Sequence, residues 1–180
     1  MKGIWDFLFL RALFDVDLFM PRRRPHLFFI AGCNGAGKTT ASRVLFPAVY
    51  QIKEFVNADA IAAGLSPFNV ESVAFQAGRL MLQRIEELIA EGTTFAFETT
   101  LSAKSYVDLI HRAKARGYKV VLIFLWLKSE KAAQQRVESR AGKGGHNIPK
   151  DVIVRRYGRR LLNLFELYMA EVDKWLLIDN

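Results

Sequence analysis

Residues 26–40 read HLFFIAGCNGAGKTT, and this stretch decides the fold. A short apolar run, 26–31, leads into a glycine-rich loop, and a helical pattern follows from Gly37 to the residue before Pro47. A continuously apolar strand is typical of a parallel sheet that helices cover on both faces. From Gly32 to Thr39 the loop matches the complete pattern G-x-x-x-x-G-K-[ST]. The order of strand, loop and helix therefore predicts a phosphate-binding loop.

The loop predicts the ATP contacts and the metal contact. Backbone N–H groups at a helix N-terminus bind phosphate oxygens, and the helix dipole favours their negative charge. Lys38 should reach the outer phosphates, and the hydroxyl of Thr39 should bind Mg²⁺. From this complete motif we expect ATP and Mg²⁺ as cofactors. We do not expect a dinucleotide, because the pattern G-x-G-x-x-G is absent and the lysine has no place in it. The residues expected to bind ATP are Gly32, Asn34, Gly35, Ala36, Gly37, Lys38, Thr39 and Thr40.

Apolar runs alternate with helical patterns along the rest of the chain. Further strands are expected at 54–56, 94–98, 119–127 and 176–178, and helices at 71–91, 102–116, 129–140 and 151–174, with Ser102 and Ser129 as N-caps. This alternation predicts an α/β, three-layer P-loop kinase fold with a central, mainly parallel sheet and a basic helical lid. Residues 26–180 should form the kinase domain and 1–25 an N-terminal extension. Ligands should bind beyond the carboxyl ends of the strands.

Composition limits the class of protein. The chain has 180 residues, of which 51% are hydrophobic and 24% charged, so we expect one globular domain rather than a disordered or collagen-like chain. The single cysteine, Cys33, excludes a disulfide framework and a cysteine-rich zinc site. A cytoplasmic location fits this cysteine usage. Asp6, Arg11 and Asp15 interrupt the apolar residues 1–20, so we expect a docking amphipathic helix there and no membrane span.

Two acidic residues follow predicted strands. Asp59, just after 54–56, could orient and deprotonate an attacking hydroxyl, or it could be the N-cap of the next helix. Glu98 ends the strand 94–98, where it could contact substrate, act on a metal through water, or simply face solvent. We also expect Thr100 to contact substrate. The strand 119–127 carries no acid, so Asp59 or Glu98 would have to replace the usual second magnesium partner.

A basic region near the C-terminus predicts an anionic partner. Residues 128–160 contain ten of the lysines and arginines and three acids, whereas the whole chain has a formal charge of +8. Arginines spaced four apart repel each other unless an anion lies between them. The glycines of 142–145 suggest a lid that closes over phosphates. The alternative is a solvated basic face. The six arginines are Arg136, Arg140, Arg155, Arg156, Arg159 and Arg160.

Several blocks in order resemble the zeta toxin family: AGCNGAGKTT, NADAIAAGLSP, QAGRLML, FAFETTLS, GGHNIPKDVIVRRY and LLIDN, from about residue 27 to 180. The resemblance implies a kinase that uses ATP to phosphorylate the 3′-hydroxyl of UDP-N-acetylglucosamine, with an antitoxin protein as partner. It implies that Asp59 is the general base, Lys38 the phosphate-binding lysine and Glu98 a substrate-binding acid. Arg140, with Arg155 or Arg156, would stabilise the transferring phosphoryl group.

Two other functions remain open. One is a kinase for another small metabolite, a nucleoside or a nucleic-acid end. We do not expect nucleic acid as a partner, because the basic residues gather near the lid rather than along a track with interleaved aromatic residues. The other is an ATP-binding module without catalytic activity, against which the presence of Asp59 argues.

Overall fold

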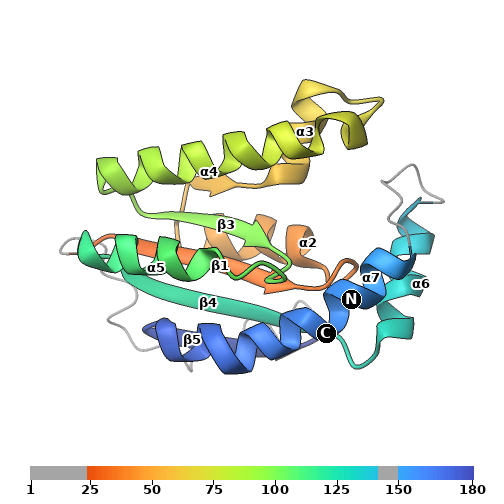
Figure 1. The fold of residues 1–180 in the computed structure, drawn as a ribbon. Helices are drawn as coiled ribbons and strands as arrows, with labels where there is room; N and C mark the ends of the chain where they lie inside the picture. Colours follow the sequence, from red (N-terminus) through yellow and green to blue (C-terminus); the bar gives the residue numbers. More distant parts are fainter. Residues whose placement is uncertain (1–23, 142–149) are drawn as a thin grey trace.

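A computed structural model describes residues 24–141 and 150–180 of the chain, and its centre is a parallel sheet (Figure 1). The five strands lie in the order β2-β3-β1-β4-β5, and every neighbouring pair is parallel. Their bounds are β1 His26–Gly32, β2 Glu54–Val56, β3 Phe95–Thr99, β4 Lys119–Trp126 and β5 Lys174–Asp179. The strand that carries the phosphate loop, β1, is therefore the central one, as a continuously apolar sequence requires.

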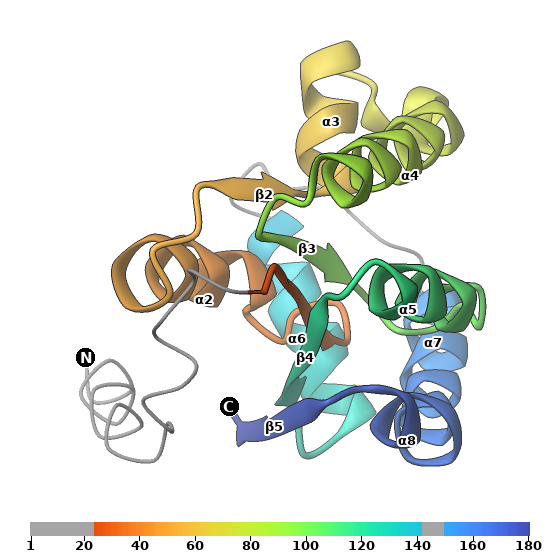
Figure 2. The same cartoon turned by 90° about the vertical axis from the view of Figure 1, so that its left-hand side faces the viewer.

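Helices cover both faces of this sheet, which gives three layers (Figure 2). One face packs on α4 (Ala74–Glu91), α5 (Tyr106–Ala115) and the segment formed by α7 (Lys150–Asn163), η5 (Leu164–Tyr168) and α8 (Met169–Glu171). The other face packs on α2 (Lys38–Val44), η3 (Leu45–Val49) and α6 (Glu130–Ala141). The predicted three-layer α/β fold is thus confirmed.

Alternate residues of β1 supply the two cores. Leu27, Phe29 and Ala31 face the layer of α4 and α5, whereas Phe28 and Ile30 face the layer of α2 and α6. The registers Phe29↔Phe97 and Phe29↔Leu122 continue the first core across β3 and β4. Burial of these side chains on both sides fixes the carboxyl end of β1, where the phosphate loop begins.

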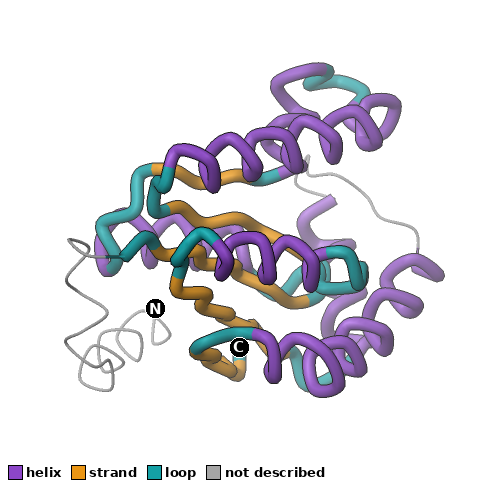
Figure 3. Tube along the Cα trace, turned by 60° about the vertical axis from the view of Figure 1, so that its left-hand side comes forward, coloured by secondary structure: helices purple, strands orange, loops and turns teal. Residues whose placement is uncertain are grey.

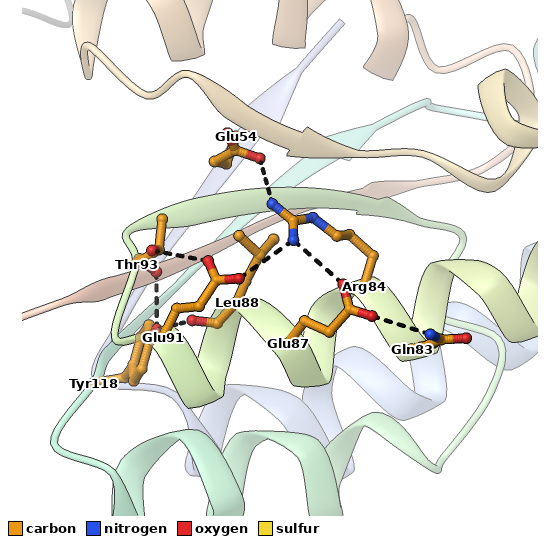
Figure 4. Close-up of polar contacts among 8 residues, drawn as sticks. All are labelled: Glu54, Gln83, Arg84, Glu87, Leu88, Glu91, Thr93 and Tyr118. Carbon is orange, nitrogen blue, oxygen red and sulfur yellow. Dashed lines mark hydrogen bonds and ion pairs between the residues drawn. The ribbon is translucent and has the colours of Figure 1, made fainter.

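Helix α3 (Ala58–Leu65), the turn η4 (Val70–Val73) and the start of α4 follow β2 and extend beyond the sheet (Figures 1 and 3). Arg84 of α4 joins Glu54 of β2 at 3.2 Å and also pairs with Glu87 and Glu91 of its own helix (Figure 4). These side chains are exposed to solvent, so the ion pairs contribute little to stability.

Several predicted boundaries differ from the structure by a few residues. Ser102 does not cap a helix: its hydroxyl pairs with Thr100, and α5 begins only at Tyr106. The helix after the phosphate loop continues past Pro47 as the π-helical turn η3, closed by the bond from the Tyr50 N–H to the Leu45 carbonyl. The last helix ends at Glu171, because Val172 is extended, and β5 is correspondingly longer than predicted. Ser129 does cap α6, through its hydroxyl and the Ala132 N–H.

Within 24–141 and 150–180, no helix combines the length and the apolar character that a bilayer crossing requires.

Candidate active site

The phosphate loop begins at the carboxyl end of β1 and closes tightly against its surroundings. Gly35 and Gly37 both have φ +81°, a left-handed conformation that favours glycine. A Cβ on Gly35 would lie 3.0 Å from the Ala133 carbonyl oxygen of α6, so a side chain would also collide with the neighbouring helix. The loop therefore needs these glycines for its conformation and for its packing. The side-chain oxygen of Asn34 is buried and has no partner, which leaves a free acceptor within the loop.

Lys38 lies across the loop and is almost completely buried. Its Nζ donates a hydrogen bond of 2.9 Å to the Cys33 carbonyl and lies 3.6 Å from Oε1 of Glu98. Burial lowers the pKa of Lys38, while the charges of Glu98 and, more weakly, Asp59 oppose that shift. A buried ammonium so close to the loop is placed to neutralise phosphate charge.

Glu98, near the end of β3, is the centre of the polar network at this site. Its Oε2 accepts hydrogen bonds from the Thr39 hydroxyl at 3.0 Å and from Nδ2 of Asn57 at 2.7 Å. The same carboxylate faces Lys38, and only 10% of its side chain is exposed. The possibility that Glu98 merely faces solvent is therefore wrong: the carboxylate connects β3 with the phosphate loop and with the end of β2.

Asn57 is an important residue that the sequence analysis did not identify. Its Oδ1 accepts the Ala60 N–H at 2.9 Å, so Asn57 is the N-cap of α3, and its Nδ2 holds Glu98. The available signal was an asparagine directly after a strand and before a helix. The alternative role of Asp59 as N-cap is thereby excluded.

Asp59 lies in the first turn of α3 and is exposed. Its charge is one of those that oppose the lowering of the Lys38 pKa, so its carboxylate lies within electrostatic reach of the phosphate loop. It has the solvent access that a base acting on an incoming hydroxyl needs. Thr100, the other residue expected at the substrate, is partly buried and its hydroxyl lies 2.9 Å from that of Ser102.

The fit of a magnesium ion depends on Thr39 and Glu98. Among the described residues, no group of three or more His, Cys, Asp or Glu side chains could hold a metal by itself. Mg²⁺ prefers oxygen donors, and it commonly uses one or two protein groups together with substrate phosphates. The hydroxyl of Thr39 and the carboxylate of Glu98, 3.0 Å apart, provide such a set beside the phosphate loop.

The structure describes three of the six arginine side chains of the predicted basic region: Arg136 and Arg159 are exposed, and Arg160 is buried. The side chains of Arg140, Arg155 and Arg156, and the whole loop 142–149, lie outside the described residues, so their expected roles stay predictions. Arg160 is fully buried, with its guanidinium 3.8 Å from the centre of the Tyr157 ring and 5.9 Å from that of Phe124. A solvated basic face is therefore wrong for Arg160, because aromatic rings of α7 and β4 enclose it.

Comparison with known proteins gives a consistent result. A model of the zeta toxin family matches residues 11–166. An uncharacterised protein of Haemophilus influenzae is 30% identical over 129 residues, which are 72% of this chain and 90% of that protein.

Two solved structures have a similar fold at low sequence identity. A chain of the PezAT chromosomal toxin–antitoxin system of Streptococcus pneumoniae is 17% identical, with a TM-score of 0.67 over all of this chain and 79% of that one. A chain of the AvrRxo1-ORF1:AvrRxo1-ORF2 structure with ATP is 19% identical, with a TM-score of 0.68 over 87% of this chain and 55% of that one. At these identities the similarity concerns the fold.

Proposed function

The chain belongs to the zeta toxin family, and from this premise we propose that it transfers the γ-phosphate of ATP to a hydroxyl of a nucleotide sugar, the 3′-hydroxyl of UDP-N-acetylglucosamine. Family membership supports an ATP-dependent kinase-type activity, and the phosphate loop with its buried lysine supports ATP as the donor. ATP in the similar AvrRxo1-ORF1:AvrRxo1-ORF2 structure agrees with this donor.

One observation carries the proposal: Lys38, Thr39 and Asn57 all contact the carboxylate of Glu98. The exposed carboxylate of Asp59 lies in the first turn of α3, the helix that Asn57 caps. Phosphoryl transfer depends on positioning and on electrostatic stabilisation more than on covalent chemistry. A phosphate cradle, an oxygen pair for a metal and an accessible carboxylate are the components that this reaction needs.

Each residue has a defined task in the proposed reaction. The loop amides and Lys38 hold the outer phosphates and neutralise the charge that develops on them. Asp59 accepts the proton of the acceptor hydroxyl, whose oxygen then bonds to the γ-phosphorus while the bond from that phosphorus to the bridging oxygen of ADP breaks. Thr39 and Glu98 would hold Mg²⁺, which supplies further neutralisation of phosphate charge. Glu98 and Thr100 would also contact the acceptor, and Arg140 with Arg155 or Arg156 would stabilise the transferring group.

An antitoxin protein is the partner that we propose for the chain. The support is family membership and the similar fold of a chain from the PezAT toxin–antitoxin system. Co-purification of the chain with the product of a neighbouring gene would test this partner.

Product analysis tests the reaction directly. The protein is incubated with ATP, Mg²⁺ and, separately, UDP-N-acetylglucosamine, uridine, free sugars and oligonucleotide ends, and each mixture is analysed by mass spectrometry. We expect a phosphorylated product with UDP-N-acetylglucosamine. A product with another acceptor alone would replace the proposed substrate, whereas ATP binding without any product would indicate a module without catalytic activity.

A further inference from the structure

Asn180 lies beside the phosphate loop, although 143 residues of sequence separate it from Gly37. The strand β5 runs parallel to β4 and ends at Asp179, so Asn180 lies at the carboxyl ends of the strands, where the phosphate loop also begins. The backbone N–H of Asn180 donates to the Trp126 carbonyl at 3.1 Å. The sheet ladder therefore holds the backbone of Asn180 in place, so its side chain projects from a fixed point.

The side chain of Asn180 contacts the loop at a critical peptide unit. Its Nδ2 donates a hydrogen bond of 2.8 Å to the carbonyl oxygen of Ala36. In a planar trans peptide the carbonyl of one residue and the N–H of the next point in opposite directions. Fixing the Ala36 carbonyl on the side of Asn180 therefore directs the Gly37 N–H away from Asn180. Gly37 precedes Lys38, at the helix N-terminus where phosphate is expected.

The hydrogen bond from Asn180 to Ala36 also limits which residue can stand at position 37. A Cβ on Gly37 would lie 2.9 Å from Nδ2 of Asn180, so a side chain at position 37 would displace the Asn180 amide from this hydrogen bond. Arg136 of α6 donates to the backbone carbonyl of Asn180 at 3.3 Å, and Cβ of Arg136 would lie 3.1 Å from a Cβ on Gly35. Asn180 and Arg136 together form one wall of the loop.

We propose that Asn180 is a positioning residue that fixes the Ala36–Gly37 peptide so that the Gly37 N–H faces the nucleotide phosphates. This inference rests on the proposed function of the loop as the ATP site. It predicts that the loss of one side-chain hydrogen bond, far along the chain, weakens the binding of nucleotides that carry a β-phosphate. It further predicts that the ligand-free protein loses no more stability than a single side-chain hydrogen bond contributes.

Calorimetric titration of the 180-residue chain with ATP, ADP and AMP tests the inference. We expect Asn180→Ala to weaken ATP and ADP by about threefold to tenfold, the range for one hydrogen bond, and to leave AMP within about twofold. Asn180→Asp should weaken ATP further, because an acceptor would then face the Ala36 carbonyl. The matched control is Asp179→Asn, since that carboxylate pairs with the exposed Lys128 at 3.5 Å and should not affect nucleotide affinity.

The outcomes separate this inference from the proposed function. If the unaltered protein binds no ATP, the proposed function fails, and the inference fails with it. If the unaltered protein binds ATP and Asn180→Ala binds it equally well, only the role of Asn180 fails. Equal weakening of ATP and AMP, or partial unfolding of Asn180→Ala at the titration temperature, would show a general structural role and overturn the inference. Asn180→Gln, which keeps the amide donor, should recover part of the ATP affinity.

Discussion

Replacement of Glu98 by glutamine should destabilise the ligand-free protein by about 2 to 4 kcal/mol at pH 7, since removal of one partner from a buried ion pair costs about 3 to 5 kcal/mol and the amide oxygen can still accept about one hydrogen bond. The exposed fractions of the Lys38 and Glu98 side chains are 7% and 10%, so water cannot take over the role of the lost carboxylate. Lys38 would remain as a buried charge facing a neutral group.

Urea unfolding without nucleotide, followed by circular dichroism, measures this loss. For a domain of this size, about 1 kcal/mol corresponds to about 2 to 4 °C in unfolding temperature, so a drop of roughly 4 to 16 °C should accompany it. The matched control is Glu54→Gln. Glu54 also pairs with a cation, Arg84 at 3.2 Å, but the exposed fractions of these side chains are 45% and 40% (Figure 4). Such an exposed pair should contribute little.

Two results would refute the reasoning. The first is a loss of less than about 1 kcal/mol in the free energy of unfolding for Glu98→Gln, which is what an exposed pair would give. The second is a loss for Glu98→Gln that is no larger than the loss for Glu54→Gln. The double variant Lys38→Met with Glu98→Gln provides a second check. It should be more stable than Glu98→Gln alone, because it no longer contains an unpaired buried ammonium.

Three further predictions concern single side chains. Asn57→Ala should cost about 1 to 2 kcal/mol through loss of the helix N-cap, and activity should fall as well because Glu98 loses a hydrogen bond; urea unfolding and a coupled assay measure the two effects. Lys38→Met should abolish ATP binding in a calorimetric titration. In the unaltered protein, the free energy of unfolding should rise as the pH becomes alkaline, because burial lowers the folded-state pKa of Lys38 and the unfolded chain therefore binds more protons than the folded one. Lys38→Met should remove this rise. Burial would raise the pKa of Asp173, but the hydrogen bond from the Val120 N–H and the charges of two nearby lysines outweigh it, so that pKa is lowered. The Asp173 carboxylate therefore stabilises the fold at pH values above its unfolded-state pKa. This contribution is lost as the pH falls through the folded-state pKa. Asp173→Asn should flatten that acid limb, which unfolding curves between neutral and acidic pH would reveal.

The sequence predicted the fold well, because its signals were local and mutually consistent. An apolar strand ending in a glycine-rich loop, with alternating strands and helices after it, leaves few arrangements of a parallel sheet. Helix ends were less predictable. Ser102 resembled an N-cap, yet its hydroxyl pairs with Thr100. The neighbouring carbonyls of Leu101 and Ala103 accept hydrogen bonds from Asn163 and Tyr168, so tertiary contacts hold the chain between β3 and α5.

The site was predictable where a motif carried it and not where packing did. Lys38, Thr39 and Glu98 do converge, as residues at the carboxyl ends of adjacent parallel strands should. The N-cap role of Asn57 had a local signal, but its bond to Glu98 and the bond of Asn180 to Ala36 span 41 and 144 residues of sequence, which no local pattern encodes. The burial of Arg160 could not be predicted from the charge pattern either, because only the fold brings aromatic rings around its side chain.

The proton transfer proposed for Asp59 is the centre of the account, and one comparison tests it most directly. Product formation from ATP and UDP-N-acetylglucosamine is measured for Asp59→Asn and for Asp108→Asn, which alters another exposed aspartate in the first turn of a helix. We predict that Asp59→Asn lowers the turnover rate by about 10²- to 10⁴-fold with ATP affinity unchanged, and that Asp108→Asn has no effect. Equal turnover rates for the Asp59→Asn variant and the unaltered protein would contradict the account.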